Sequence, residues 1–317
     1  MKRVLIILLI IIFPFCFTGC SCRTKEDIEI YTTVYALDFI TKSIVGDKVK
    51  VKSVYPASAE IHEYEPSAKQ LIAMSKADII FYIGQGLEPF IENGLQSTFK
   101  NTNCVKITSY SSLNLVNYAG THAHMGSDTD SADESSFDPH IWLDPDSMEE
   151  IANIILINLL SVEKYKEFEE YFRSNYSLLI EKIKALALTY HQTLDVSANK
   201  TIIVDHDAYA YWTYRYNIER IGLRGDNESS DPNSKDMIET INIAIEKRIK
   251  YILATKYESQ EDLIKSYVRQ VNDKDSTLGC SVLYLDNLET FVPEGEDYFS
   301  VMESNLEILK KALEIEK

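Results

Sequence analysis

Short apolar runs alternate with helical patterns along most of this 317-residue chain, and the alternation limits the folds that it can adopt. We predict strands at residues 28–34, 49–55, 77–83, 104–108, 201–204, 218–223, 251–255 and 281–285. Strands interleaved with helices are typical of parallel sheets. The pattern therefore predicts an α/β fold with two lobes, each with a mainly parallel sheet flanked by helices.

One long helix is predicted to separate the two series of strands. Apolar residues recur at steps of three and four from Phe168 through Leu179 to Tyr190, which is the period of an amphipathic helix. A helix over residues 164–194 would be roughly 40 Å long or more, enough to join two lobes. We predict an N-terminal lobe at 28–163, a rigid linking helix at 164–194 and a C-terminal lobe at 195–317.

The N-terminus has the pattern of an export signal. A basic start is followed by an apolar run at 4–17, which is shorter than the ~20 residues that a membrane-spanning helix needs. The stretch FTGC at 17–20 resembles the lipobox of bacterial lipoproteins, with Phe17 at the usual leucine position. It implies a signal peptide at 1–19, a lipid on Cys20 and a tether at 20–27, which would anchor the protein to the extracellular face of the cell membrane. Ordinary secretion with a nearby cleavage site is the alternative.

The charge and the cysteines exclude some classes of protein. The chain has 49 acidic and 32 basic residues and a net charge of -17, which disfavours binding to nucleic acid. Of five cysteines, only Cys104 and Cys280 lie in the body of the protein, both beside apolar strand residues. We interpret them as small buried hydrophobic residues rather than a disulfide pair or metal ligands.

Three of the six histidines lie beside carboxylates at the ends of predicted strands or in loops. His62 and His140 belong to the N-terminal half, and His206 closely follows the strand at 201–204. Asp286 follows the strand at 281–285 in the same way. Ligands of parallel sheets bind at the carboxyl ends of strands, so these side chains would meet between the lobes. Three imidazoles and one carboxylate suit a tetrahedral Zn²⁺ site.

The motifs around these residues resemble those of a known family. The stretches are HEYEP at 62–66, DPHIWLDP at 138–145, DHDAYAY at 205–211 and LDNL at 285–288. In this order they resemble the metal-binding solute-binding proteins of zinc and manganese ABC importers, of the cluster A-I type. The resemblance covers nearly the whole mature chain. It implies a monomeric protein that is not an enzyme, binds the metal through His62, His140, His206 and Asp286, and delivers it to a membrane permease.

The choice of metal depends on two loops. Manganese-binding members add a second carboxylate in the loop at 224–232, where our alignment places Ser229 with Glu228 beside it. Imidazole-rich tetrahedral sites favour Zn²⁺, so we predict zinc, with Mn²⁺ as the alternative. Zinc-specific members also carry a loop rich in histidine and acids. The loop at 119–137 resembles a short version of it, with His122 and His124 as accessory ligands; a solvated acidic linker is the alternative.

Carboxylates near the ligand histidines are candidates for supporting roles. A carboxylate that accepts the far ring N–H of a metal-bound histidine fixes its tautomer and raises its basicity. We consider Glu65, Asp144, Asp205 and Glu228 for this role, with helix capping or solvent exposure as the alternative for each.

Two functions of other classes compete with metal capture. In a zinc hydrolase, Asp286 would act as a general base and leave water on the metal, but neither a nucleophile elbow nor an HExxH motif is present. A lipid-anchored surface adhesin is the second alternative, and no stretch of the sequence specifies its partner.

Overall fold

The structure is a computed structural model that describes residues 29–57, 59–117, 137–197, 200–223, 234–257 and 261–315. The predicted signal peptide, the lipidation site Cys20, the accessory ligands His122 and His124, and Glu228 all lie outside the described residues. Asn117 and Phe137 form an antiparallel bridge at the two ends of the 118–136 segment.

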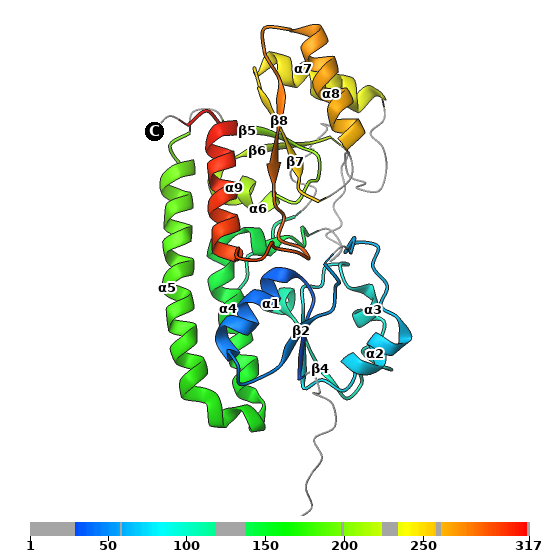
Figure 1. Ribbon diagram of the computed structural model, residues 1–317, viewed down its shortest axis with the longest axis vertical. Helices are drawn as coiled ribbons and strands as arrows, with labels where there is room; N and C mark the ends of the chain where they lie inside the picture. The colour runs from blue at the N-terminus through cyan, green and yellow to red at the C-terminus, as the bar shows by residue number, and fades with distance from the viewer. Residues whose placement is uncertain are drawn as a thin grey trace, which may run out of the picture.

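The N-terminal half contains a parallel sheet of four strands. They are β1 (Ile30–Thr32), β2 (Val51–Ser53), β3 (Ile79–Tyr82) and β4 (Asn103–Lys106), in the order β2-β1-β3-β4. Helices α2 (Ala68–Met74) and α3 (Pro89–Glu92) lie on one side of this sheet, and α1 (Tyr35–Val45) lies on the other (Figure 1). Because β2 is the first strand in the order of this sheet, it is an edge strand.

The C-terminal half repeats this architecture with a second parallel sheet. Its strands are β5 (Thr201–Val204), β6 (Glu219–Gly222), β7 (Tyr251–Thr255) and β8 (Ser281–Leu285), in the order β6-β5-β7-β8. Its helices are α6 (Ala210–Tyr216), α7 (Ser234–Glu246), α8 (Glu261–Lys274) and α9 (Tyr298–Ala312). The predicted α/β fold with two parallel sheets is confirmed.

The predicted long helix starts later than expected. Helix α4 (Pro145–Ser161) is followed by a 3-10 segment, Glu163–Phe168, and then by α5 (Glu169–Leu194), which has 26 residues. The chain reverses between α4 and α5, and the tighter 3-10 turns take up this reversal. α5 runs beside both lobes, packing on α1 and α4 below and on α9 above (Figure 1).

The largest hydrophobic core is shared by the two halves. It contains Ile30 and Phe81 from the first sheet, Tyr190 from α5, and Leu285 and Leu309 from the second half, each fully buried. The hydroxyl of Tyr190 also donates a 2.7 Å hydrogen bond to the carbonyl of Met302 in α9. The two sheets therefore share one continuous apolar base along α5, and smaller clusters fill the space between each sheet and its outer helices.

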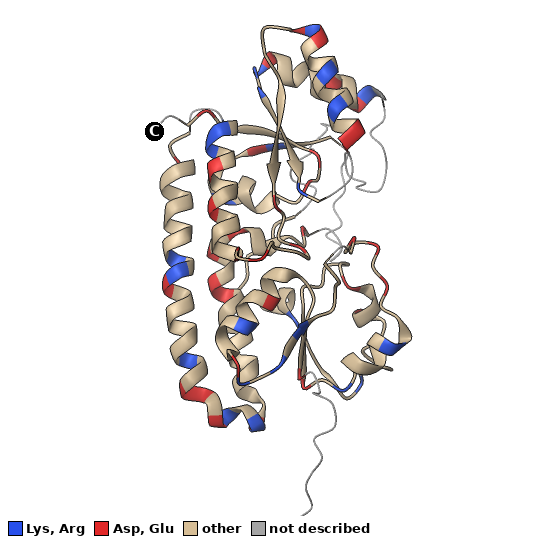
Figure 2. Ribbon diagram, viewed as in Figure 1, with Lys and Arg blue, Asp and Glu red and all other residues tan. Residues whose placement is uncertain are grey.

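No helix in the described part of the chain is long and apolar enough to cross a membrane. Acidic and basic residues are interspersed along α5 and α9 (Figure 2).

Glu88 is a fully buried carboxyl group whose protonation should govern part of the stability. It accepts hydrogen bonds from the hydroxyl of Thr33 at 2.6 Å and from the backbone N–H groups of Ile83 and Gly84. Burial nevertheless outweighs these bonds and raises its pKa from 4.5 to about 7. Because the fold favours the protonated carboxyl group, Glu88 contributes stability that is fully present below about pH 4.5. This stabilisation decreases as the unfolded chain ionises above pH 4.5, and it is lost as the pH rises through about 7.

We expect the change Glu88→Gln to remove this pH dependence. Relative to the variant, the unmodified metal-free protein should lose about 3 kcal/mol of unfolding free energy between pH 4.5 and pH 8. Urea denaturation of both proteins at several pH values measures this difference. Parallel stability profiles would show that Glu88 ionises normally in the fold.

Candidate metal centre

Three histidines and one glutamate converge between the two sheets. His62 lies in the loop after β2, His140 in the turn before α4, His206 two residues after the end of β5, and Glu289 shortly after β8. One ligand atom from each of the four lies within 4.8 Å of all the others. The three predicted histidines therefore come together, two from the N-terminal half and one from the C-terminal half.

Glu289 is the centre of this group. Its Oε1 atom lies 3.5 Å from Nε2 of His140, 3.8 Å from Nε2 of His206 and 4.0 Å from Nε2 of His62. Nε2 of His140 and Nε2 of His206 are 3.3 Å apart. Donor atoms at bonds of about 2 Å around a tetrahedral Zn²⁺ lie roughly 3.3 Å from one another. The three distances to Oε1 of Glu289 exceed this spacing by about 0.2–0.7 Å, so the side chains would draw together around a bound ion.

The burial of the group requires a compensating charge. His140, His206 and Glu289 are buried, while His62 faces the solvent in part. Oε1 of Glu289 is itself buried and accepts no hydrogen bond within the described part of the chain. A buried carboxylate oxygen without a hydrogen bond is costly, and a cation bound at this point would stabilise it.

Asp138 orients the ring of His140. Oδ1 of Asp138 lies 2.7 Å from Nδ1 of His140 and accepts the backbone N–H of His140 at 2.8 Å, while Oδ2 accepts the N–H of Ala210. The carboxylate holds the proton on Nδ1, so Nε2 is the nitrogen that faces the site and would bind a metal once its own proton is lost. Burial alone would lower the pKa of His140, but Asp138 and Glu289 raise it to about 9. A metal must therefore displace a proton from His140.

We expect Asp138→Asn to weaken zinc binding by about 10–100-fold, the usual effect of removing a carboxylate that supports a ligand histidine. Competition against a chromogenic zinc chelator at pH 7.5 measures the change. Asp146→Asn is the matched control, because Asp146 contacts His191 rather than a histidine of the site. Equal affinities for Asp138→Asn and the unmodified protein would contradict this role.

Three of the carboxylates that we predicted as supports, Asp144, Asp205 and Glu65, lie in the described part of the chain. Asp144 is buried but pairs with Arg215 at 2.7 Å and accepts the hydroxyl of Ser147. Oδ1 of Asp205 accepts the backbone N–H groups of His206 and Thr255, and so shapes the turn that carries His206. Glu65 is exposed. We did not predict Asp138 as a support for His140, because its place two residues earlier, before Pro139, is also typical of a turn.

The carboxylate in the group is that of Glu289, and Asp286 is not among the four residues. Oδ1 of Asp286 accepts the N–H of Leu288, which has a left-handed backbone (φ 55°). The carbonyl of Asn287 accepts the indole N–H of Trp142, and that of Glu289 accepts the N–H of Tyr35. These bonds fold the loop after β8 so that Glu289 reaches the histidines. The sequence signal for it was only an additional acid three residues beyond Asp286.

A pocket of about 390 Å³ opens on Glu289 from the solvent. Its lining includes Glu60, Asp286 and Glu289, together with the exposed aromatic residues Tyr257 and Phe291. The rings of Tyr257 and Phe291 meet edge to face, 5.6 Å apart. The pocket gives a cation an acidic approach to the group.

The sequence profile of the family described as "Zinc-uptake complex component A periplasmic" matches residues 30–312. This chain belongs to that family. The resemblance inferred from the histidine motifs is thereby confirmed.

The relatives within the family include proteins named for zinc. The chain is 28% identical over 308 residues to the zinc-binding lipoprotein AdcA of Streptococcus pneumoniae, and the match covers 94% of this chain but 58% of AdcA. It is 25% identical over 299 residues to the high-affinity zinc uptake system protein ZnuA of Bacillus subtilis, covering 92% and 90% of the two chains. It is similar to the crystal structure of the Zn(II)-bound ZnuA-like domain of Streptococcus pneumoniae AdcA, with a TM-score of 0.71, 26% identity and coverage of 91% and 99%.

Proposed function

We propose that this protein captures Zn²⁺ outside the cell and delivers it to the membrane permease of an ABC importer. The observation that carries the proposal is the convergence of three imidazole nitrogens on Oε1 of Glu289. Membership of a zinc-uptake family and the zinc-binding names of its relatives support it. The metal is cargo here, and Glu289 would take the fourth position that a catalytic zinc leaves open to water. We therefore expect no enzymatic activity.

The donor set favours zinc over manganese. It offers three nitrogen atoms and one carboxylate, whereas Mn²⁺ prefers more oxygen ligands and a higher coordination number. A manganese-binding member of the same family is the alternative. It would need a further oxygen ligand, which Asp286 or Glu228 could supply.

The division of the ligands between the halves suggests how the ion is held and released. His62 and His140 belong to the first half, and His206 and Glu289 to the second. Because the two halves share one hydrophobic core along α5, a small tilt of one half against the other costs less free energy than a wide opening, which would expose that core. A tilt that withdraws the loop of Glu289 would break the ligand set when the protein docks on the permease. We propose that the protein acts as a monomer, anchored through a lipid on Cys20, with His122 and His124 as accessory ligands.

Metal analysis of the protein, purified without added metal and then titrated with Zn²⁺ and Mn²⁺ in competition, tests the proposal. We expect one Zn²⁺ per chain and a preference for zinc of at least about 100-fold, as expected from the nitrogen-rich ligand set. Tighter binding of Mn²⁺, or the absence of a stoichiometric metal, would overturn it. The adhesin alternative predicts instead a protein ligand whose binding survives the double change His140→Ala and His206→Ala; no contact in the described residues favours it.

A further inference from the structure

A second pocket lies on the far side of the N-terminal sheet from α1. It has a volume of about 380 Å³ and opens between the edge strand β2 and helix α2. Its apolar floor is formed by Val54, Ala73 and Met74. Val54 and Met74 are buried and belong to the cluster between this sheet and its outer helices. This volume is in the range of sites for small molecules.

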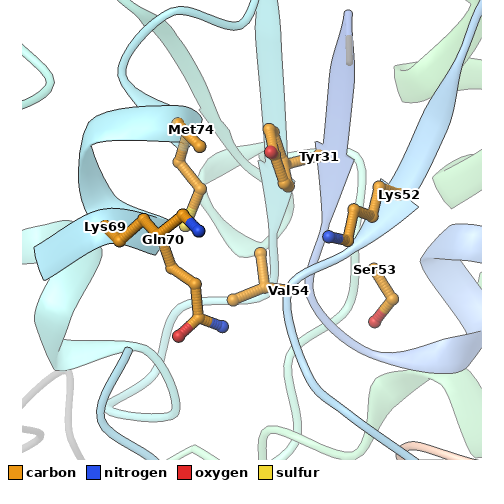
Figure 3. A pocket seen from close by; sticks show the side chains of 8 residues that line it. Tyr31, Lys52, Ser53, Val54, Lys69, Gln70 and Met74 are labelled. Atoms are coloured by element: carbon orange, nitrogen blue, oxygen red, sulfur yellow. The ribbon is translucent and has the colours of Figure 1, made fainter. Parts of the chain in front are cut away.

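The register of the sheet places a lysine in an otherwise apolar row. Residues paired across parallel strands share one face, and the row runs from Cys104 through Ile80 and Tyr31 to Lys52. The first three pack into the cluster under α2 and α3. Lys52, at the edge, extends its side chain along the same face into the pocket (Figure 3).

A second lysine faces the first. Lys69 comes from α2, and in Figure 3 the ammonium groups of Lys52 and Lys69 point toward each other from opposite walls. Neither side chain has an ion pair or hydrogen bond with another described residue. Two other lysines of this half form ion pairs: Lys106 with Glu92 at 3.1 Å, and Lys164 with Glu29 at 2.7 Å. Two unpaired like charges across a pocket repel each other, and a bound anion would relieve this repulsion.

Tyr31 adds a third donor. The residue is only 6% exposed, its ring forms one wall of the pocket, and its hydroxyl has no hydrogen bond with another described residue. Burial raises its pKa above 10, so the hydroxyl keeps its proton and can donate. The other polar groups of the lining are already bonded: Ser53 donates to the carbonyl of Thr33, and Gln70 donates to Tyr64.

We propose that this pocket binds a small organic anion. Its carboxylate or phosphate group lies between Lys52 and Lys69 and accepts the hydroxyl of Tyr31, while its apolar part packs on Val54 and Met74. None of the eight lining residues is acidic, in a chain whose net charge is -17. A lysine on an edge strand also guards that strand against pairing with another chain. Protection of the edge strand explains the lysine at position 52. It does not explain Lys69, which lies on helix α2 and faces Lys52 across the pocket.

Nuclear magnetic resonance of the zinc-loaded, methyl-labelled protein tests the proposal, with benzoate, acetate and inorganic phosphate as probes. Benzoate should cause a saturable shift of the Met74 and Val54 methyl signals, with a Kd in the millimolar range, and should bind at least about 10-fold more tightly than acetate. Phosphate added to the benzoate-bound protein should displace benzoate and so reverse the shifts of the same methyl signals.

Matched variants separate the site from net charge. Lys52→Met with Lys69→Met should weaken benzoate binding by about 10-fold or more. Lys76→Met with Lys100→Met removes the same charge from two exposed lysines of the same half and should leave it unchanged. Equal losses in the two pairs, no saturable shift at these methyls, or phosphate binding without benzoate binding would overturn the proposal. Tyr31→Phe tests the hydroxyl group alone and should weaken benzoate binding by a smaller factor than the double change at Lys52 and Lys69.

Discussion

Replacing His140 or His206 by alanine is expected to lower the affinity for zinc by more than about 100-fold, beyond the 10–100-fold effect of a supporting residue. Each change removes one of four donor atoms, and both rings are buried, with Nε2 within 3.8 Å of Oε1 of Glu289. Water replaces a lost nitrogen poorly in a site closed by packing. His62 is partly exposed, so water can take its place more easily and His62→Ala should cost less.

Competition titration with a zinc chelator measures these affinities, and circular dichroism checks that each variant is folded. His191→Ala is the matched control, because His191 lies near the end of α5 and contacts Asp146 and Asp195 instead of the site. It should bind zinc like the unmodified protein. If the His62, His140 and His206 variants each retained one tightly bound zinc, the site would have to lie elsewhere.

The second large effect concerns the carboxylate ligand. Glu289→Gln should weaken zinc binding by about 100-fold, because it removes the anionic oxygen on which the three histidines converge. Asp286→Asn should weaken binding by less than about 10-fold at equilibrium, since an asparagine oxygen can still accept the N–H of Leu288 and keep the loop in place. The same chelator competition compares the two variants.

The pair of variants discriminates between the two candidate ligands. The motif-based assignment of Asp286 predicts the opposite order, with the greater loss in Asp286→Asn. Glu296→Gln, an exposed acid of the same segment, controls for the loss of one negative charge. A slower association rate in Asp286→Asn without a large change in affinity would agree with its position in the approach pocket.

Local patterns were sufficient for the elements of the fold. The predicted strands at 201–204, 251–255 and 281–285 coincide with β5, β7 and β8, because short apolar runs bounded by turns and rich in β-branched or aromatic residues are typical of strands. The start of the long helix was less accurate. Residues 163–168 carry helical residues, yet the reversal between α4 and α5 tightens them into 3-10 turns. That reversal follows from the packing of α5 on α4 and is not encoded locally.

The amino-acid sequence by itself was sufficient to recognise the alternating α/β pattern, the long helix and the three histidines as candidate ligands. These features depend on local periodicity and on the residues next to each histidine. The tertiary structure decided which carboxylates join them. Asp138 and Glu289 reach the histidines through the turn at 138–140 and through the loop after β8, which Trp142 and Tyr35 hold from the other half of the molecule. Ligands so far apart along the chain meet only through packing, so the position of a donor atom to within an ångström is a property of the folded core.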